Sequence, residues 1–239
     1  MVLVSSNKLL LSIFVDKKVV LVDSESGQVL SEIVLQDNPR YVCMTSAHLA
    51  AATLVNKNIQ FLKVHGSSLK ADTTVNLDVN VMGIAAYQDN LVVTYDTSGV
   101  RIISKDGTLI HNLDNTTAGR EVFKKPRFIA TTSDDSIYIT DWETHEITRL
   151  DSILTILQTF SGSMLKSPCG MIALNRDQLL VCNHSNNNIL LIRPSTRNMT
   201  VFLENQNELK TPLSICFCKE QKKLYVALNA DRVLVFQLS

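Results

Sequence analysis

The sequence predicts an all-β fold, a six-bladed β-propeller of four-stranded antiparallel blades. Three observations lead to this prediction. Short runs of alternating apolar residues, separated by turn residues, follow one another along the chain of 239 residues, as expected for strands joined by hairpins. An Asp or Asn recurs near the end of each expected second strand, about every 40 to 46 residues, and a period of this length is typical of propeller blades. Proline precedes four of the expected first strands, where no N–H donor is needed.

The recurring Asp and Asn residues have a structural explanation. An Asx side chain bonds the backbone two residues further on and holds a tight turn. These positions are Asp16, Asn56, Asp96, Asp141, Asn183 and Asn229. The prolines are Pro39, Pro126, Pro168 and Pro212. The propeller fold explains both the Asp and Asn residues and the prolines, so neither set by itself indicates a ligand-binding site.

The clearest unit is residues 125–160. Apolar alternations over 128–132, 137–140 and 146–150 and a closing run over 154–160 predict its four strands. Strands this short, with Asp-containing turns between them, suit hairpins better than helical crossovers.

The other units repeat this pattern in order. Their turns are expected at 6–7, 16–18 and 24–27 in the first blade, 66–68 in the second, 89–90 and 106–107 in the third, and 175–177 and 194–198 in the fifth. The dipeptide at 106–107 is Asp-Gly, a strong hairpin signal. We therefore expect one domain whose blades cover residues 1–35, 38–77, 79–113, 125–160, 167–203 and 211–239.

The sixth blade is expected to have three strands, over 213–217, 224–227 and 233–238. Either its outer edge is open, or a strand upstream of Met1 completes it and the chain is the C-terminal part of a longer protein. An open edge presents unpaired backbone groups and invites pairing with another chain. Edge-mediated self-association is therefore one expected interaction.

Charge and cysteine content narrow the function classes. Lys and Arg total 23 and Asp and Glu total 23, so no overall field attracts nucleic acid or an anionic membrane. The five cysteines show no CxxC pair, which indicates buried free thiols in a reducing compartment. The apolar N-terminus is interrupted at residues 5–8 and its charges follow the apolar run, so we expect neither a signal peptide nor a membrane span. The expected location is the cytoplasm.

Two segments carry a family resemblance. SDDSIYITDWETHEITRL (133–150) and RDQLLVCNHSNNNILLI (176–192) resemble NHL repeats, which build six-bladed propellers. The chain is similar to the C-terminal propellers of tripartite-motif proteins, although AHLAAATLVNKNIQFL (47–62) lacks the usual acidic residue. The resemblance implies the substrate-recognition part of a larger protein. Any ubiquitin-ligase activity would belong to a RING domain, and this chain has no zinc-binding Cys/His spacing.

Enzymatic functions find little support in the sequence. The chain has no GxSxG nucleophile elbow and no Gly-rich phosphate loop. A metal-dependent enzyme resembling the six-bladed lactonases and amidating lyases would draw its ligands from the blade turns, at Asp96, Asp141, Asn183, His184 and Asn229. The Asx turn already accounts for the Asp and Asn residues. We therefore predict a non-enzymatic protein with no catalytic residue, metal or cofactor, and keep the metal-dependent enzyme as an alternative.

The loops between blades and those between second and third strands open on one face of a propeller, and such loops often carry function. The longest inter-blade connection, 114–125, leads into REVFKKPRF (120–128), the densest basic run of the chain. NPRY and KPRF place Arg40 and Arg127 at equivalent positions, each beside an aromatic residue. The predicted binding residues are Arg40, Tyr95, Lys124, Lys125, Arg127, Trp142 and His184.

A protein or peptide is the favoured partner, because acidic residues share this face with the basic ones. Single-stranded RNA is the alternative. In NHL propellers that bind RNA, the strand lies on this face, where aromatic rings stack on bases and basic groups neutralise phosphates. No membrane partner is expected. Trp142 is the only tryptophan and is set in a turn, so we expect it to be partly exposed, which favours a role in recognition.

Overall fold

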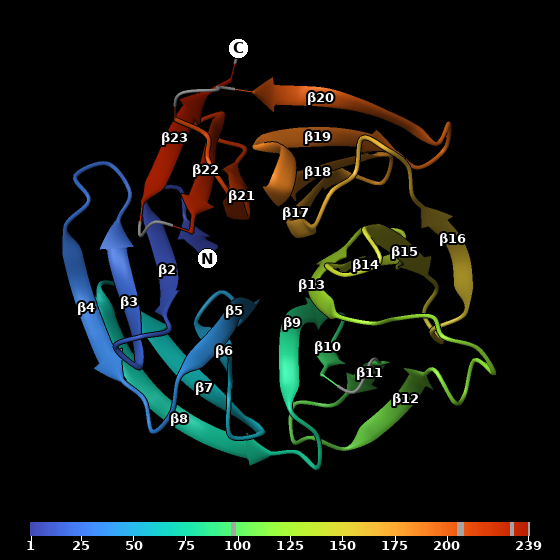
Figure 1. Ribbon diagram of the computed structural model, residues 1–239. Coiled ribbons are helices and arrows are strands. Elements are labelled where there is room, and N and C mark those ends of the chain that lie inside the picture. Colours follow the sequence, from blue (N-terminus) through green and yellow to red (C-terminus); the bar gives the residue numbers. More distant parts are fainter. Residues whose placement is uncertain (97–98, 205–207, 230–231, 239) are drawn as a thin grey trace. The chain divides into compact units, whose positions relative to one another are not determined.

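The computed structural model describes residues 1–96, 99–204, 208–229 and 232–238. In these residues six antiparallel sheets follow one another along the chain, five with four strands and the last with three. Each strand pairs with the next one in sequence, so every sheet is an up-and-down meander (Figure 1). These sheets are the blades of a six-bladed β-propeller. The predicted all-β fold class is confirmed, including the three-stranded last blade.

The chain divides into two compact units, residues 1–112 and 113–239. The first unit contains three sheets. Its strands are β1 (Val2–Ser5), β2 (Lys8–Ile13), β3 (Lys18–Asp23), β4 (Val29–Val34), β5 (Pro39–Ser46), β6 (Leu49–Leu54), β7 (Asn58–His65), β8 (Ser68–Asn76), β9 (Val81–Tyr87), β10 (Asn90–Tyr95), β11 (Gly99–Ile103) and β12 (Leu109–Asp114). Adjacent sheets pack against each other, since β5 contacts both β2 and β9. Their apolar faces form the core, where Leu10 and Leu21 meet Ala52 and Leu62.

The second unit contains the other three sheets. Its strands are β13 (Pro126–Thr131), β14 (Ile137–Asp141), β15 (Glu146–Leu150), β16 (Ile156–Phe160), β17 (Pro168–Asn175), β18 (Gln178–Asn183), β19 (Asn188–Arg193), β20 (Asn198–Glu204), β21 (Pro212–Cys218), β22 (Lys223–Leu228) and β23 (Val233–Gln237). The first strands again lie side by side, with β17 in contact with both β13 and β21. Tyr138 and Phe160 pack with Leu179 and Leu190 in the core between two of these sheets.

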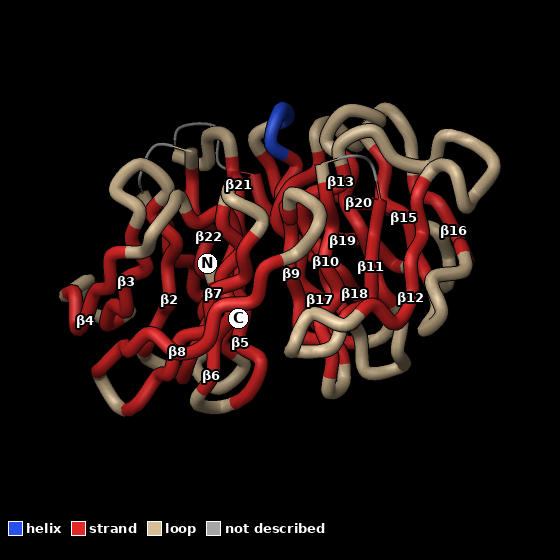
Figure 2. The backbone as a smooth tube through the Cα atoms, turned by 90° about the horizontal axis from the view of Figure 1, so that it is seen from below, coloured by secondary structure: helices blue, strands red, loops and turns tan. Residues whose placement is uncertain are grey.

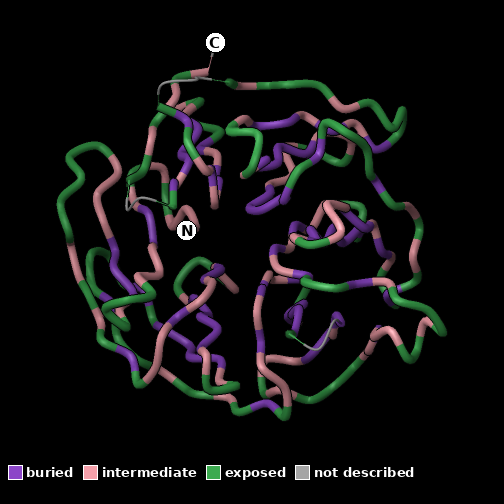
Figure 3. The backbone as a smooth tube through the Cα atoms, viewed as in Figure 1, coloured by how far each residue is buried: buried purple, intermediate pink, exposed green. Residues whose placement is uncertain are grey.

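Burial follows the position of a strand within its sheet. All five residues of β14, a second strand, are buried; its first three residues are apolar, and the neighbouring sheet packs against it through β17. The outermost strands β4 and β20 are mostly exposed or half-buried. Figure 3 shows the same gradient, with purple segments on the inner strands and green on the outer ones.

The predicted proline positions are confirmed, since four first strands begin at proline. These strands are β5, β13, β17 and β21. Across each sheet the proline pairs with Asp141 or Asn183 in two blades but with Leu54 or Leu228 in two others. Asn56 and Asn229 lie between the second and third strands of their blades, just after the strand end. An apolar residue occupies the aligned position there.

The Asx turn itself is present at Asp141. Its Oδ1 accepts hydrogen bonds from the backbone N–H groups of Glu143 and Thr144, both at 3.0 Å. The described residues also contain one short 3₁₀ turn, η1 (His184–Asn186), which Figure 2 shows in blue beyond the ends of the strands. No helix in the described part of the chain has the length and apolarity required to span a membrane.

Candidate recognition site

Three of the predicted binding residues meet in the second unit. Arg127 lies on β13, Trp142 follows β14 and His184 begins η1. The Cζ atom of Arg127 lies 4.9 Å from the centroid of the Trp142 ring, which is a cation–π distance. The His184 ring meets the same indole edge-on, with 4.7 Å between centroids and 62° between planes, a favourable aromatic geometry. We call these three residues the Trp142 cluster.

Asp141 fixes two members of the cluster. This residue is 2% exposed and ends β14. While its Oδ1 holds the turn that carries Trp142, its Oδ2 accepts hydrogen bonds from the N–H groups of Lys124 at 2.7 Å and Lys125 at 3.0 Å. The N–H of Trp142 donates to the carbonyl of Lys125 at 3.1 Å. One carboxylate therefore ties the start of the strand that carries Arg127 to the turn that carries the indole.

Asn183 does the same beside His184, with an amide in place of the carboxylate. Its side chain is fully buried. The Oδ1 atom accepts a hydrogen bond from the N–H of Lys166 at 2.7 Å. The Nδ2 atom donates to the carbonyl of Met164 and to Oδ1 of Asn188, both at 2.8 Å. The turn that presents His184 is thereby joined to the segment entering β17.

His184 has an unsatisfied ring nitrogen. Its Nδ1 is buried and has no hydrogen-bond partner within the described structure. Burial, and then the positive charge of Arg127, lower the pKa of His184 from its usual value of 6.5, so the ring is neutral at neutral pH. A neutral imidazole offers one donor and one acceptor, and leaving a buried polar group unpaired costs about 1–3 kcal/mol.

The two predicted lysines lie at the edge of the cluster and are exposed. The Nζ atom of Lys125 forms an ion pair with Oε2 of Glu143 at 2.8 Å. This hydrogen bond and the lysine charge lower the pKa of Glu143. Exposed pairs of this kind contribute little to stability, but the pairing neutralises a charge that would otherwise attract a phosphate backbone.

The long connection before β13 is closed at its base. The side chain of Asn115 donates from Nδ2 to the carbonyl of Phe123 at 2.9 Å, and its Oδ1 accepts from the N–H groups of Val122 and Phe123 at 2.7 and 3.0 Å. The Phe123 side chain is fully buried. Asn115 and Phe123 therefore form a neck, and residues 116–121, which are mostly exposed, lie outside it.

Arg40 and Tyr95 belong to the first unit. Arg40 follows a strand-initial proline as Arg127 does. It is half-buried, its Nη1 contacts Sδ of Met82, and its Nε is buried without a hydrogen-bond partner in the described structure. Tyr95 is only 3% exposed and donates its hydroxyl to Oδ1 of Asn112 at 3.0 Å. Its ring therefore presents almost no surface, contrary to our expectation for the loop face.

The groups considered for catalysis are engaged in structure. Both carboxylate oxygens of Asp141 accept hydrogen bonds from backbone N–H groups. In the described part of the chain, no group of three His, Cys, Asp or Glu residues could hold a metal ion. All five cysteines are free and buried, as predicted. Burial raises the pKa of Cys43, Cys169 and Cys216 to about 12, so these thiols are inert at neutral pH.

Sequence reasoning missed two neighbours of the cluster. Glu143 was not placed beside the basic run, although it lies one residue after the tryptophan in the same turn. His145, which was not among the predicted residues, accepts a hydrogen bond on Nδ1 from the N–H of Ser167 at 3.0 Å. The signal for both was the shared turn WETH, residues 142–145.

Comparisons with known proteins identify the fold and no family. No protein-family model matches the chain, and no curated protein matches it. Among solved structures, the chain is similar to a protein of unknown function from Bacteroides caccae (TM-score 0.75, 12% identity, covering 98% of this chain and 90% of that one). It is also similar to a streptogramin B lyase (TM-score 0.72, 17% identity, covering 100% and 82%). The β-propeller domain of Cps50 (Swd1) from Myceliophteria thermophila gives a TM-score of 0.70 at 12% identity, covering 98% and 81%.

Proposed function

We propose that this chain is a non-enzymatic recognition platform that binds a protein or peptide partner at the Trp142 cluster. The observation that carries the proposal is a half-buried tryptophan flanked by an arginine and by a histidine whose buried Nδ1 has no partner in the described structure. Tryptophan and arginine are enriched at binding hot spots. Surface loops on a rigid scaffold are common binding sites, and the propeller fold is consistent with such a platform.

The chemistry of the cluster suits a peptide better than RNA. The indole offers apolar surface, Arg127 offers its guanidinium to a carbonyl or carboxylate, and His184 adds a half-buried aromatic ring. An extended peptide supplies the complementary groups, namely apolar side chains, carbonyls and carboxylates. RNA binding requires unpaired positive charge along a groove, whereas Lys125 is paired with Glu143 and the chain carries no net charge.

The resemblance of residues 133–150 and 176–192 to NHL repeats supports a finer proposal. On this basis the platform is the substrate-recognition part of a larger tripartite-motif-like protein in the cytoplasm. The outer strand β23, whose Val233 and Val235 are 36% and 49% exposed, provides an additional edge for pairing with a second chain.

The test uses the single tryptophan as a reporter. A random peptide library is selected on the wild-type protein. Enriched peptides are then titrated while tryptophan fluorescence is recorded. We expect Arg127→Gln to weaken binding about tenfold or more, as for other hot-spot residues, and Lys219→Gln, an exposed lysine in the β21–β22 turn, to have no effect. Binding to Trp142→Ala, which lacks the reporter, is measured by isothermal titration calorimetry, and peptides that bind it as tightly as wild type would refute the assignment.

Single-stranded RNA remains the second candidate because Lys124, Lys125 and Arg127 adjoin the indole. If RNA is the ligand, a random RNA pool is retarded at low salt and Arg127→Glu abolishes the retardation and flattens its salt dependence.

The metal-dependent enzyme is a third candidate, which the likeness in fold to a streptogramin B lyase keeps open. It requires stoichiometric metal in the purified protein and a melting temperature that falls with chelator. Metal content near zero removes it.

A further inference from the structure

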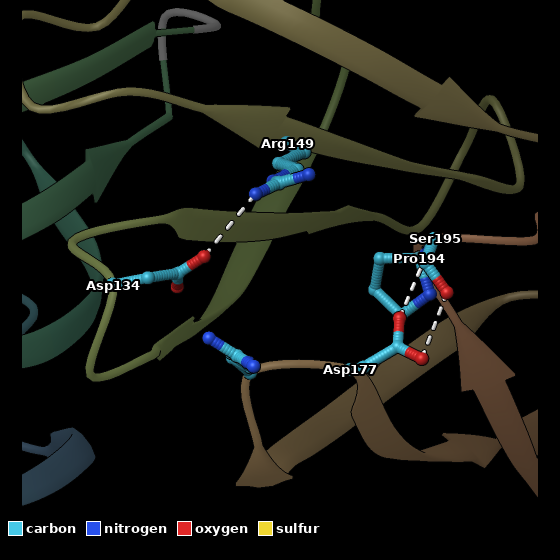
Figure 4. A pocket seen from close by; sticks show the side chains of 6 residues that line it. Asp134, Arg149, Asp177, Pro194 and Ser195 are labelled. Carbon is cyan, nitrogen blue, oxygen red and sulfur yellow. Dashed lines mark hydrogen bonds and ion pairs between the residues drawn. The ribbon is translucent and has the colours of Figure 1, made fainter.

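The second unit contains a cavity at the other ends of its strands from the Trp142 cluster. Its volume is about 340 Å³, and its lining residues are Asp134, Arg149, Arg176, Asp177, Pro194 and Ser195. They come from the β13–β14, β17–β18 and β19–β20 turns and from β15, so two neighbouring blades form the cavity. Figure 4 shows Asp134 and Arg149 on one side and Asp177 with Ser195 on the other.

Arg149 is held in place with donors left over. Its Nε and Nη2 donate to Oγ of Ser136 at 3.1 and 2.8 Å, and Nη2 pairs with Oδ2 of Asp134 at 3.4 Å. Its Cζ lies 5.8 Å from the centroid of the Tyr138 ring. Nη1 forms no hydrogen bond within the described residues. A guanidinium group has five N–H donors in a fixed fork. These contacts therefore hold the Arg149 side chain in one orientation and leave some of its donors without an acceptor in the part of the chain that the structure describes.

Arg176 adds a second unused guanidinium to the lining of the cavity, whereas Tyr138 lies beneath Arg149 and is not a lining residue. Arg176 is exposed and, in the described part of the chain, forms neither an ion pair nor a hydrogen bond. The Tyr138 side chain is fully buried under Arg149, and its hydroxyl has no hydrogen bond of normal geometry in the described structure. A buried hydroxyl left without a partner is unfavourable.

The two carboxylates of the cavity, in contrast, are already engaged. Asp177 accepts hydrogen bonds from the N–H and Oγ of Ser195 at 2.7 and 2.8 Å, and these bonds lower its pKa. Asp134 accepts a hydrogen bond from Oγ1 of Thr132 at 2.5 Å and pairs with Arg149. The cavity therefore has spare donors but few spare acceptors.

We propose that this cavity is a binding site for a carboxylate, held between the guanidinium groups of Arg149 and Arg176. The arginine fork matches two carboxylate oxygens. A phosphate monoester carries a charge of about −1.5 to −2 and would be repelled by both Asp134 and Asp177, whereas a carboxylate carries one charge. The volume lies near the lower end of the range for ligand pockets and suits a small organic acid or one acidic side chain of a peptide.

The site is independent of the proposed recognition function, so the two are tested separately. Acetate, the capped peptide acetyl-Gly-Glu-Gly-amide and inorganic phosphate are titrated into ¹⁵N-labelled protein at low ionic strength. We expect saturable shifts confined to the β13–β14, β17–β18 and β19–β20 turns, with a Kd on the order of 1 mM. Tighter binding of acetate assigns a free acid, and tighter binding of the peptide assigns an acidic side chain.

Three variants decide the outcome. Arg176→Gln should weaken binding about tenfold, and because this side chain is exposed the fold should be unaffected. Asp134→Asn should strengthen binding about threefold by removing a repulsive charge. Arg197→Gln removes an exposed charge from the β19–β20 turn without lining the cavity and should change nothing. Tighter binding of phosphate, the absence of saturation, or equal loss in Arg176→Gln and Arg197→Gln would each overturn the proposal.

Discussion

Replacing Asp141 by alanine should destabilise the second unit by about 3–6 kcal/mol. The carboxylate is 2% exposed and accepts four backbone hydrogen bonds, from Lys124 at 2.7 Å and from Lys125, Glu143 and Thr144 at 3.0 Å. A hydrogen bond to a charged group contributes about 1.5–3 kcal/mol. Four bonds to one carboxylate are not additive, so we take roughly half of their sum.

Asp141 and Asn183 occupy aligned positions in neighbouring blades. Exchanging the carboxylate and the amide at these two positions tests whether each side chain is required for its own hydrogen bonds. In Asp141→Asn one oxygen is kept but the amide nitrogen faces backbone donors, and we expect a loss of about 1.5–3 kcal/mol. In Asn183→Asp the carboxylate meets the Met164 carbonyl and Oδ1 of Asn188, both acceptors at 2.8 Å. This variant should lose about 2 kcal/mol, although the two positions are equivalent in the repeat.

Urea unfolding, followed both by the fluorescence of Trp142 and by far-UV circular dichroism, measures these changes as shifts in midpoint at constant m-value. Glu121→Gln is the control, since this exposed acid lies in the connection before β13 and should change stability by less than about 0.5 kcal/mol. If Asp141→Ala stays within the same limit, the carboxylate does not hold the blade together.

Three further predictions concern single residues. On acidification, His184 should quench Trp142 fluorescence with a midpoint below pH 6.5, because burial and then the charge of Arg127 lower its pKa. Since its folded pKa lies below the unfolded one, stability should fall as pH drops through about 6.5, and His184→Gln should remove both effects. In Gly170→Ala the new Cβ would lie 2.6 Å from Cα of Ser214, so thermal unfolding should reveal a loss of about 2 kcal/mol or more. A thiol reagent at pH 8 should label none of the five cysteines in the native protein and all of them in urea, because burial keeps the reagent away from their sulfur atoms.

The blades could be predicted from the sequence because the rules that form their strands and turns act on neighbouring residues. A first strand that begins with proline, a buried second strand and a turn after it follow from backbone rules that act within a few residues. The meeting of Arg127 and Trp142 was also accessible, since both flank the same proline-to-Asp141 pairing. His184 was accessible through Asn183, the aligned residue of the next blade.

The remaining features depend on packing between segments distant in sequence. Tyr95 ends a second strand, as Asp141 does, but its ring lies 5.0 Å below Cζ of Arg101 and is buried. The sequence gives no indication of this pairing. The carboxylate cavity is equally hidden, because its residues are contributed by three separate turns and one strand, and none of them forms a motif.

Because the neck formed by Asn115 and Phe123 closes the base of the connection, the number of residues in the connection should have little effect on the stability of the blade that follows it. The amide of Asn115 closes the base through three hydrogen bonds, and buried Phe123 anchors it in the core. The exposed residues 116–121 therefore add little to folding, and loop closure becomes only slowly more costly as a loop lengthens. This connection is the natural place to graft a fluorescent or affinity module, close in sequence to the recognition residues but outside the hydrogen bonds that position them.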